Sequence, residues 1–549
     1  MTVPDDLRKQ AAAWLADDPD SETVDELTRL LAAADADPQA LAELTDRFSG
    51  RLEFGTAGLR GAVAAGPNRM NRAVVIRAAA GLSAYLKSTT GTGTVAVGYD
   101  ARHKSDVFAR DTAAVMRGAG LDAVLLPGPL PTPLLAFAIG HLDCIAGVMV
   151  TASHNPPQDN GYKVYLADGS QIVPPADAEI SAFIDAVGSA SDVPRGESWT
   201  VLDESIVTSY VDAVAALPDR QTPRDLAMVY TPLHGVGDQT VQRALARAGF
   251  AAPVVVPEQA DPDADFPTVS FPNPEEPGAM DLAMALAAEC GADLVLANDP
   301  DADRCAVAVP IADGWRMLSG DELGVLLGDH LLRRGVRGVF ATSIVSSSLL
   351  GRMAEANGVS YLETLTGFKW IGRVPGLTYG YEEALGYCVA PQLVRDKDGI
   401  SALLRVAELA AGLKSEGRGL LDRLDEIACQ YGVYATSQLS VRVTDPGLIT
   451  QAMERLRAQS PAMLGGFAVE SAEDLSHGSD GLAPTDGLRY RLASQGRVVV
   501  RPSGTEPKIK CYLEVVVAVE AGDVDAAHIA AAGRLDAIRA DLAEAAGLS

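Results

Sequence analysis

Short apolar runs alternate with helix-like segments along most of the chain. Five runs have the length and composition of buried strands: 94–100, 144–150, 225–230, 293–299 and 337–345. Ala-rich segments with helical spacing, such as 107–120 and 280–290, lie between them. Strands that alternate with helices are typical of α/β domains. The pattern therefore predicts α/β organisation for the central part of the chain.

The two ends of the chain have a different pattern. Residues 1–48 combine acidic and Ala/Leu-rich stretches with helical spacing, which predicts a helical extension. Past residue 430, the segments 434–443 and 497–504 alternate like half-exposed strands, and a long Ala-rich helix closes the chain. This pattern predicts a smaller α+β domain at the C-terminus.

A chain of 549 residues is longer than one hydrophobic core normally organises. Breaks in the pattern occur near 187–203, 310–316 and 430. The length predicts roughly three to five domains. After a helical N-terminal extension, 1–48, the breaks divide the chain into the segments 49–200, 201–312, 313–430 and 431–549.

Composition excludes several classes of function. The net charge is −28, from 45 basic and 73 acidic residues, so the average surface repels nucleic acid and anionic membranes. No apolar run approaches the roughly 20 residues that span a bilayer, and the N-terminus lacks signal-peptide features. We therefore expect a cytoplasmic protein with no nucleic-acid or membrane partner. The six cysteines show no CxxC spacing, so no zinc site or disulfide framework is indicated.

The first chemical candidate is the turn that follows the apolar run 144–150. This turn reads Thr-Ala-Ser-His-Asn-Pro-Pro over 151–157. A rigid polar turn at the end of a buried strand is where α/β proteins present reactive groups. Ser153 is a candidate nucleophile or phosphoryl acceptor, with His154 and Asn155 as hydrogen-bonding neighbours. The alternative is an ordinary turn whose polar side chains satisfy local backbone groups.

The second candidate is an acidic segment after the run 293–299. In extended backbone, alternate side chains share a side, so Asp299, Asp301 and Asp303 can converge on one cation. Oxygen-only ligands suit Mg²⁺. A calcium EF-hand is excluded, because Arg304 and Pro310 stand where its loop requires Gly and Glu. An acidic, solvated turn is the remaining alternative.

The scarce basic residues gather in a few Gly-rich or polar loops. They are Arg60, Arg102, His103, Lys104, Lys163, Lys369, Arg395, Lys397, Arg501 and Lys508. In the last loop, Ser503, Gly504 and Thr505 offer hydroxyl and N–H donors between two cations, which favours a phosphate cradle. The alternative for this loop is a polar hairpin.

These motifs together resemble those of the α-D-phosphohexomutases, the phosphoglucomutase and phosphomannomutase enzymes. The resemblance rests on TASHNPP, DPDADR, FGTAGLRG, GYEEALGY and RPSGTEPK, in family order from about residue 50 to 515. The longer motifs TLTGFKWIG and FPTVSFPNPEE look most like the phosphoglucomutase-2-like branch.

The resemblance implies a fold and an activity. The fold has three related α/β mixed-sheet domains and a smaller C-terminal α+β domain that closes a central cleft. The activity is interconversion of hexose 1-phosphate and hexose 6-phosphate, with glucose as the first candidate hexose and mannose as the second. It proceeds through a phosphoserine enzyme and a hexose 1,6-bisphosphate, with Mg²⁺ as cofactor and glucose 1,6-bisphosphate as activator. The expected partner is a small-molecule phosphosugar substrate. The expected oligomeric state is a monomer or a homodimer.

The resemblance also implies roles for individual residues. The catalytic set is Ser153, His154, Arg60, Lys163 and Lys397. The metal ligands are Ser153, Asp299, Asp301 and Asp303. The substrate-binding set is Thr56, Asn155, Arg304, Thr366, Gly367, Lys369, Glu382, Glu383 and Arg395. The phosphate-binding set is Arg501, Ser503, Gly504, Thr505 and Lys508.

The sugar loop departs from the usual family pattern. Ala384, or Leu385 in a shifted register, replaces a common Ser, and Tyr387 stands where some members have His. The register of Glu382 and Glu383 and the preferred hexose therefore stay open, and Lys397 with His154 is the acid–base candidate. The alternatives are a mutase for a pentose or amino-sugar phosphate, a metal-dependent sugar phosphatase and a non-catalytic phosphosugar-binding protein.

Overall fold

The computed structural model describes residues 3–52, 58–443, 447–479, 481–502 and 508–547. The chain forms two compact units. The first contains Met1–Met317 and Ala390–Glu408, and the second contains Leu318–Val389 and Leu409–Ser549. No helix among the described residues is long and apolar enough to cross a bilayer.

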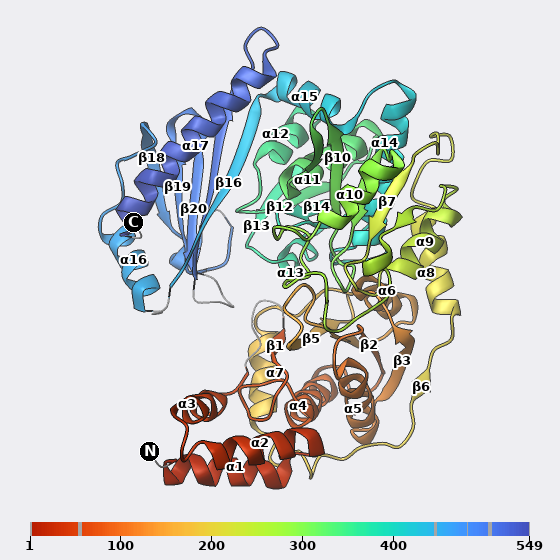
Figure 1. The fold of residues 1–549 in the computed structure, drawn as a ribbon, viewed down its shortest axis with the longest axis vertical. Helices are drawn as coiled ribbons and strands as arrows, with labels where there is room; N and C mark the ends of the chain where they lie inside the picture. The colour runs from red at the N-terminus through yellow and green to blue at the C-terminus, as the bar shows by residue number, and fades with distance from the viewer. Residues whose placement is uncertain (1–2, 53–57, 444–446, 480, 503–507, 548–549) are drawn as a thin grey trace. The chain divides into compact units, whose positions relative to one another are not determined.

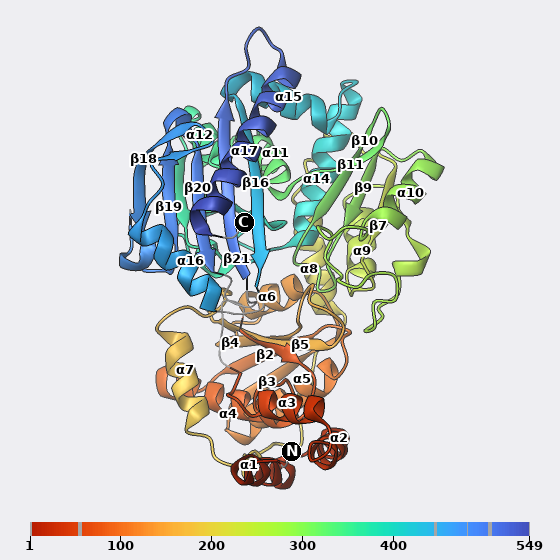
Figure 2. The ribbon, with the colours of Figure 1, turned by 60° about the vertical axis from the view of Figure 1, so that its left-hand side comes forward.

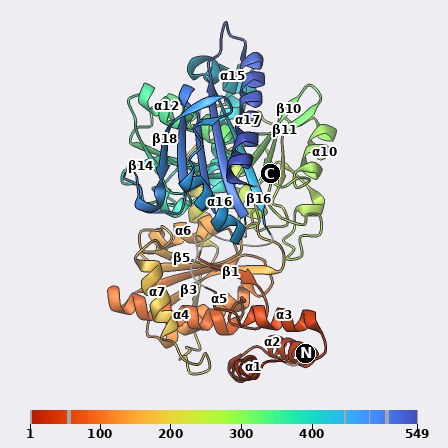
Figure 3. The same cartoon turned by 90° about the vertical axis from the view of Figure 1, so that its left-hand side faces the viewer.

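Three helices open the first unit: α1 (Asp5–Asp17), α2 (Ser21–Ala33) and α3 (Pro38–Arg47). Asp20 and Asp37 cap α2 and α3 by accepting hydrogen bonds from backbone N–H groups in the first turn. The three helices lie together near the N-terminus (Figure 3). They enclose a small apolar cluster that includes Leu27 and Leu44. The N-terminal extension is therefore a folded helical layer on the first unit.

The first sheet has the strand order β1-β5-β4-β2-β3-β6. Its strands are β1 (Leu59–Ala62), β2 (Thr94–Tyr99), β3 (Asp122–Pro129), β4 (Ala146–Val150), β5 (Asp159–Leu166) and β6 (Thr200–Val201). Its helices are α4 (Arg72–Thr89), α5 (Ser105–Gly118), α6 (Thr132–His141) and α7 (Ala176–Asp185). Helices α4 and α5 lie on one side of the sheet and α6 on the other (Figure 1). Because both faces are covered, the central strands are continuous apolar runs.

The second sheet of this unit has the order β11-β10-β9-β7-β8. Its strands are β7 (Met228–Thr231), β8 (Val254–Val255), β9 (Leu294–Ala297), β10 (Ala306–Ile311) and β11 (Gly314–Met317). Its helices are α8 (Ser205–Ala215), α9 (Asp238–Arg247) and α10 (Asp281–Cys290), with a short 3₁₀ turn at Pro257–Gln259. The antiparallel connection between β9 and β10 carries the acidic segment 299–303.

The second unit begins with a four-stranded sheet of order β13-β12-β14-β15. Its strands are β12 (Val339–Ser343), β13 (Ser360–Thr364), β14 (Leu377–Glu382) and β15 (Gly386–Cys388). The accompanying helices are α11 (Gly320–Arg333), α12 (Leu349–Ala356), α13 (Phe368–Ile371), α14 (Gly399–Ser415) and α15 (Leu420–Tyr431). The first half of α14 belongs to the first unit and its second half to the second unit.

The C-terminal sheet is antiparallel throughout, with the order β16-β21-β20-β19-β18-β17. Its strands are β16 (Val433–Arg442), β17 (Met463–Leu464), β18 (Phe467–Asp474), β19 (Leu488–Leu492), β20 (Arg497–Pro502) and β21 (Lys508–Val517). Two short 3₁₀ turns, Leu475–His477 and Ala493–Gln495, connect strands. Helix α17 (Val524–Ala546) packs across β16 and β21 and also contacts α16 (Gly447–Ala458) (Figure 2). Three mixed α/β sheets followed by this antiparallel sheet confirm the predicted fold class.

Candidate active site

Ser153 lies in the turn directly after β4, in the first unit. The turn holds it in the left-handed region with φ of 51°, and only 3% of the residue is exposed. Its N–H donates to Thr151 Oγ1 at 2.8 Å, and its hydroxyl donates to Asp299 Oδ2 at 2.6 Å. His154 Nδ1 lies 3.3 Å from the same hydroxyl oxygen. The fold thus joins the predicted reactive serine to the predicted metal site.

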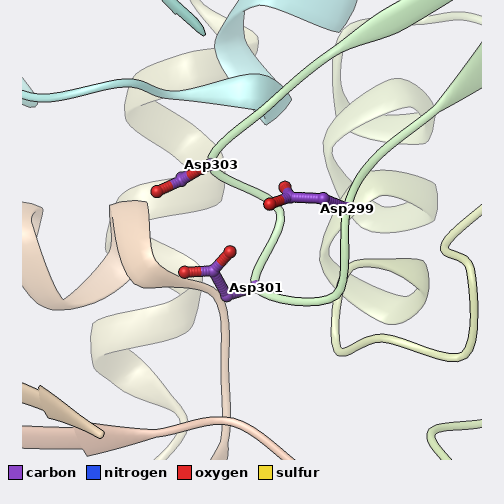
Figure 4. A group of neighbouring side chains, drawn as sticks. All are labelled: Asp299, Asp301 and Asp303. Carbon is purple, nitrogen blue, oxygen red and sulfur yellow. The ribbon is translucent and has the colours of Figure 1, made fainter. Parts of the chain in front are cut away.

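Asp299, Asp301 and Asp303 project from the loop after β9 and are fully buried. Figure 4 shows their carboxylates converging, and one oxygen of each lies within 4.8 Å of the others. Within the described part of the chain, Asp301 Oδ1 and Asp303 Oδ1 have no hydrogen-bond partner. Buried carboxylate oxygens without a partner are costly unless a cation is bound. This all-oxygen set fits a hard divalent cation.

Two lysines face the carboxylates. Lys163 on β5 donates to Asp301 Oδ2 at 2.7 Å and to Asp303 Oδ2 at 2.8 Å. Lys397 Nζ lies 3.3 Å from Asp303 Oδ2 and 3.7 Å from Asp396 Oδ1. Burial alone would lower the pKa of Lys163, but the charges of Asp301 and Asp303 outweigh it and raise that pKa. Lys163 therefore stays protonated at neutral pH.

The carboxylates themselves titrate differently because of these neighbours. Burial opposes ionisation of Asp303, but Lys163, Lys397 and Arg304 outweigh it and hold its pKa well below the usual value. For Asp299, burial and the charges of Asp301 and Asp303 raise the pKa well above the usual value. Because the cluster concentrates negative charge, a bound cation would favour the ionised form of Asp299.

Two arginines flank His154. Arg60 on β1 donates to Asn155 Oδ1 at 2.8 Å, and Arg304 Nε lies 3.9 Å from Asp299 Oδ2. Burial, then the charges of Arg304 and Arg60, lower the pKa of His154 well below 6.5. His154 is therefore a neutral imidazole at physiological pH. Arg395, on the loop that carries Lys397, is exposed.

Apart from Thr56, the remaining predicted residues belong to the second unit. Gly367, with φ of 104°, precedes α13, and Thr366 lies just before it. Lys369 Nζ lies 5.9 Å from the centre of the Trp370 ring. Arg501 on β20 pairs with Lys510, and Lys508 begins β21. Thr56, Ser503, Gly504 and Thr505 lie outside the described residues.

Glu382 ends β14, and Glu383 follows it. The Glu383 carboxylate accepts hydrogen bonds from Ser343 at 3.1 Å and from Ser346 at 2.9 Å. Ser343 is the last residue of β12, and Ser346 lies in the turn that follows it; residues 343–348 are called the serine turn below. The orientation of Glu383 is thus set by this serine turn.

The same serine turn also contacts the C-terminal sheet of its unit. Ser347 Oγ and Ser348 N–H both donate to Glu514 Oε1 at 2.8 Å, and the Ser346 carbonyl accepts from Arg497. Ser347 N–H donates to the buried carboxylate of Asp321 at 2.6 Å. One short turn therefore connects the predicted sugar loop to strands β20 and β21, which flank the predicted phosphate loop.

Comparison with known proteins decides the family. The four domain families of the phosphoglucomutase/phosphomannomutases match successive parts of the chain: domain I at 51–191, domain II at 208–311, domain III at 319–431 and the C-terminal domain at 439–531. The chain belongs to this family. Members of the phosphoglucomutase/phosphomannomutase family are mutases that transfer a phosphoryl group within a sugar phosphate, so the predicted resemblance and enzyme class are confirmed.

Individual family members cover nearly the whole chain. A probable phosphomannomutase of Haemophilus influenzae is 49% identical over 453 residues, 81% of this chain and 93% of that protein. The human phosphopentomutase is 36% identical over 571 residues, 93% of this chain and 91% of that protein. The crystal structure of a putative phosphomannomutase from Thermus thermophilus is 27% identical, with a TM-score of 0.70, and covers 89% of this chain and 99% of that one.

The structure adds residues that sequence reasoning missed. Thr132, at the start of α6, donates to Asp301 Oδ2 at 2.5 Å, and its N–H donates to the Asp301 carbonyl at 2.9 Å. Gly235 packs against the carboxylate loop so closely that a Cβ there would lie 2.3 Å from Pro300 Cα. No local pattern distinguishes either residue, because each acts through a segment far away in the sequence. Each helps to fix the carboxylate loop of this family member.

Proposed function

We propose that this chain is a magnesium-dependent phosphosugar mutase that interconverts hexose 1-phosphate and hexose 6-phosphate, with glucose as the first candidate substrate and mannose as the second. The observation that carries the proposal is the 2.6 Å hydrogen bond from the Ser153 hydroxyl to Asp299, within a buried carboxylate cluster. A serine beside a metal-type site, surrounded by Arg60, Arg304 and Lys163, suits a phosphoryl carrier, because phosphoryl transfer depends on positioning and charge neutralisation.

The chemical cycle needs one phosphoryl group on Ser153. The bond between phosphorus and Ser153 Oγ breaks while a bond to the 6-hydroxyl oxygen of hexose 1-phosphate forms; that hydroxyl loses its proton, and Ser153 Oγ gains one to become a hydroxyl. The hexose 1,6-bisphosphate then reorients, and Ser153 loses its hydroxyl proton as it takes the phosphoryl group from O1, while O1 gains a proton and hexose 6-phosphate is released. Glucose 1,6-bisphosphate, as activator, would supply the first phosphoryl group.

The chain's own residues suit the separate tasks of this cycle. Arg60 and Arg304 place positive charge beside Ser153, where the negative charge of the transferred group develops. We propose Lys397, together with neutral His154, for the proton transfers at the sugar hydroxyls. Lys163, which two carboxylates hold in its charged form, would orient phosphoryl oxygens and not accept a proton.

Asp299, Asp301 and Asp303 would hold Mg²⁺. The bound ion would supply charge neutralisation for phosphoryl oxygens. Asp301 Oδ1 and Asp303 Oδ1 lack a hydrogen-bond partner among the described residues, so these oxygens would be available as ligands.

The residues of the second unit would recognise the rest of the substrate. We propose that Glu382 and Glu383 contact sugar hydroxyls and that the loop 501–508, with its two terminal cations, binds the phosphate that is not reacting. Thr366, Gly367 and Lys369 are proposed to bind substrate beside them. Charged and backbone donors suit a phosphate site that must accept a 1-phosphate and a 6-phosphate in turn.

A pentose phosphate is the second candidate substrate, because the human phosphopentomutase is 36% identical over 93% of this chain. Phosphorus NMR time courses test both candidates, with glucose 1-phosphate, mannose 1-phosphate and ribose 1-phosphate in parallel samples that contain Mg²⁺ and a trace of glucose 1,6-bisphosphate. The proposal predicts fastest growth of a hexose 6-phosphate signal and no inorganic phosphate. Faster conversion of ribose 1-phosphate would assign a pentomutase, and inorganic phosphate as the main product would assign a phosphatase.

A further inference from the structure

One buried arginine gathers the backbone of the loop that carries Ser153. Arg102 Nη1 donates to the carbonyls of Pro156 at 2.8 Å and Asp159 at 3.1 Å. Its Nη2 donates to the carbonyl of Ser153 at 2.6 Å and to that of Asn155. Each Nη carries two N–H groups, so all four of these donors point into the loop. Only 1% of this side chain is exposed.

The guanidinium is itself held from two sides. Arg102 Nε lies 3.5 Å from Asp100 Oδ2, and Asp100 Oδ1 accepts from Arg102 N–H at 3.0 Å and from Ser105 Oγ at 2.7 Å. The ring of Phe266 covers the guanidinium, with its centre 4.9 Å from Cζ. Ser105 in turn accepts from Asn160 at 3.0 Å, at the end of the Ser153 loop. The segment 100–105 and the loop 153–160 are thus one hydrogen-bonded assembly.

The loop needs such a cation for two physical reasons. Four carbonyl oxygens that converge in a buried place repel one another and are costly without donors. In addition, a left-handed serine costs roughly 1 kcal/mol and persists only where the surroundings impose it. In the observed loop the Ser153 carbonyl accepts from Arg102 while the backbone has φ of 51° and the hydroxyl reaches Asp299.

These contacts exclude phosphate binding, which is the simplest role for a basic residue in an enzyme that acts on phosphosugars. Since all four Nη donors are committed to backbone carbonyls, Arg102 does not offer them to a phosphate. A lysine cannot replace it, because an ammonium has three donors and lacks the planar fork that spans four carbonyls.

We propose that Arg102 is a positioning residue that fixes the loop conformation in which Ser153 carries the phosphoryl group. The inference rests on the proposed function of Ser153. It assigns to Arg102 an effect on the rate of phosphoryl transfer, with little effect on substrate binding, because the arginine touches the loop and not the substrate.

The test compares Arg102→Lys with Arg72→Lys as a matched control. Arg72 makes a bidentate ion pair with Asp111 at 2.7 and 2.8 Å in the same domain, outside the Ser153 loop. Hydrogen exchange of the peptide 151–163 is expected to accelerate by about tenfold in Arg102→Lys, the effect of losing about 1.4 kcal/mol of local stability, and not to change in Arg72→Lys. The kcat for hexose phosphate conversion is expected to fall about 100-fold, as for a misplaced reacting group, while KM stays within about threefold.

Two outcomes would overturn the inference: unchanged exchange of peptide 151–163, or a loss of kcat no greater than that of Arg72→Lys. If Arg102→Lys does not fold, Phe266→Leu serves in its place, because it removes the ring over the guanidinium and keeps the arginine. It is expected to accelerate exchange of the same peptide, and unchanged exchange would again contradict the inference. Exchange is measured without turnover, so an inactive wild-type chain would refute the proposed function while the exchange data still decide the role of Arg102.

Discussion

The hydroxyl of Ser153 donates a 2.6 Å hydrogen bond to Asp299, although 146 positions separate the two residues in the chain. Ser153 follows a strand of the first sheet and Asp299 follows a strand of the second. Each residue lies just past the end of a fully buried strand, where a rigid scaffold can present it. This relationship makes the serine and the carboxylate cluster a single site, and the predictions below depend on it.

The carboxylate cluster predicts how activity depends on a divalent cation. Chelation by EDTA is expected to abolish turnover, and added Mg²⁺ to restore it. Asp303→Asn removes one charged ligand and is expected to raise the Mg²⁺ concentration for half-maximal activity, roughly 10- to 100-fold by analogy with changes beside metal ligands. Titration of kcat against free Mg²⁺ measures this shift.

Asp265→Asn is the matched control for that titration, because Asp265 is an exposed carboxylate paired with His103 and lies outside the cluster. Its Mg²⁺ dependence should equal that of the wild-type chain. A wild-type Mg²⁺ dependence in Asp303→Asn would show that the cluster does not bind the activating ion.

His154 predicts a feature of the pH profile. Burial and the charges of Arg304 and Arg60 lower its pKa well below 6.5, so the imidazole is already neutral at pH 6 and stays neutral as pH rises. The profile of kcat between pH 6 and 8 should therefore have the same shape in His154→Gln, with kcat about 100- to 10,000-fold lower from the loss of a proton-transfer group. An ionisation near pH 6.5 that is present in the wild-type profile and absent in the variant would contradict this assignment.

The serine turn predicts an effect on sugar binding. Ser346→Ala removes a 2.9 Å hydrogen bond to Glu383, and a hydrogen bond to a charged group is worth about 1.5–3 kcal/mol. If Glu383 contacts the sugar, KM for the hexose 1-phosphate should rise about tenfold, and steady-state kinetics measures it. Ser415→Ala, at an exposed serine whose hydroxyl donates to the Gly412 carbonyl of its own helix, is the control. An unchanged KM in Ser346→Ala would assign the sugar contact to Glu382.

Asp321 predicts a pH dependence of stability in the second unit. Burial raises its pKa from the ordinary 3.8 to about 7, assisted by the nearby charges of Glu383 and Glu514 and opposed by hydrogen bonds from Ser347 and Thr436. Between pH 4 and pH 7 the folded state therefore binds more protons than the unfolded state, so the free energy of unfolding falls as pH rises through this window. A shift of about three pKa units corresponds to a loss of at most about 4 kcal/mol.

Asp321→Asn tests this dependence, because an amide reproduces the uncharged acid and can still accept from Ser347 N–H and Tyr381 OH. The variant should melt at a higher temperature than the wild-type chain at pH 7.5, and the difference should shrink toward pH 5. A variant that is less stable than the wild-type chain by the same amount at both pH values would show that Asp321 is ionised in the folded state.

Much of the fold could be predicted from sequence because buried strands leave a clear pattern. Strands β2, β4, β7, β9 and β12 correspond to the five apolar runs, since strands covered on both faces are continuously apolar. Ser153 and the three aspartates could be identified because each lies in a short contiguous motif. That the two motifs meet could not be predicted from either motif, because the contact depends on how two sheets pack.

The role of Arg102 could not be predicted from the sequence. The sequence placed it only among the basic residues that gather in polar loops, and the structure turns the side chain inward onto four backbone carbonyls. Backbone acceptors carry no sequence signal, so a cation that binds them cannot be distinguished from one that binds a ligand. Thr132 likewise reaches Asp301 from a helix 169 positions away.

Transfer of a labelled phosphoryl group through Ser153 tests the central claim most directly. The wild-type chain and Ser153→Ala are incubated with Mg²⁺ and phosphate-labelled glucose 1,6-bisphosphate, and each is digested to locate the label. Ser170→Ala, at another buried serine of the same domain, is the control. The account predicts label on the peptide that contains Ser153, its transfer to unlabelled glucose 1-phosphate during a chase, and no label in Ser153→Ala. Label on another residue, or its release as inorganic phosphate during the chase, would contradict the account.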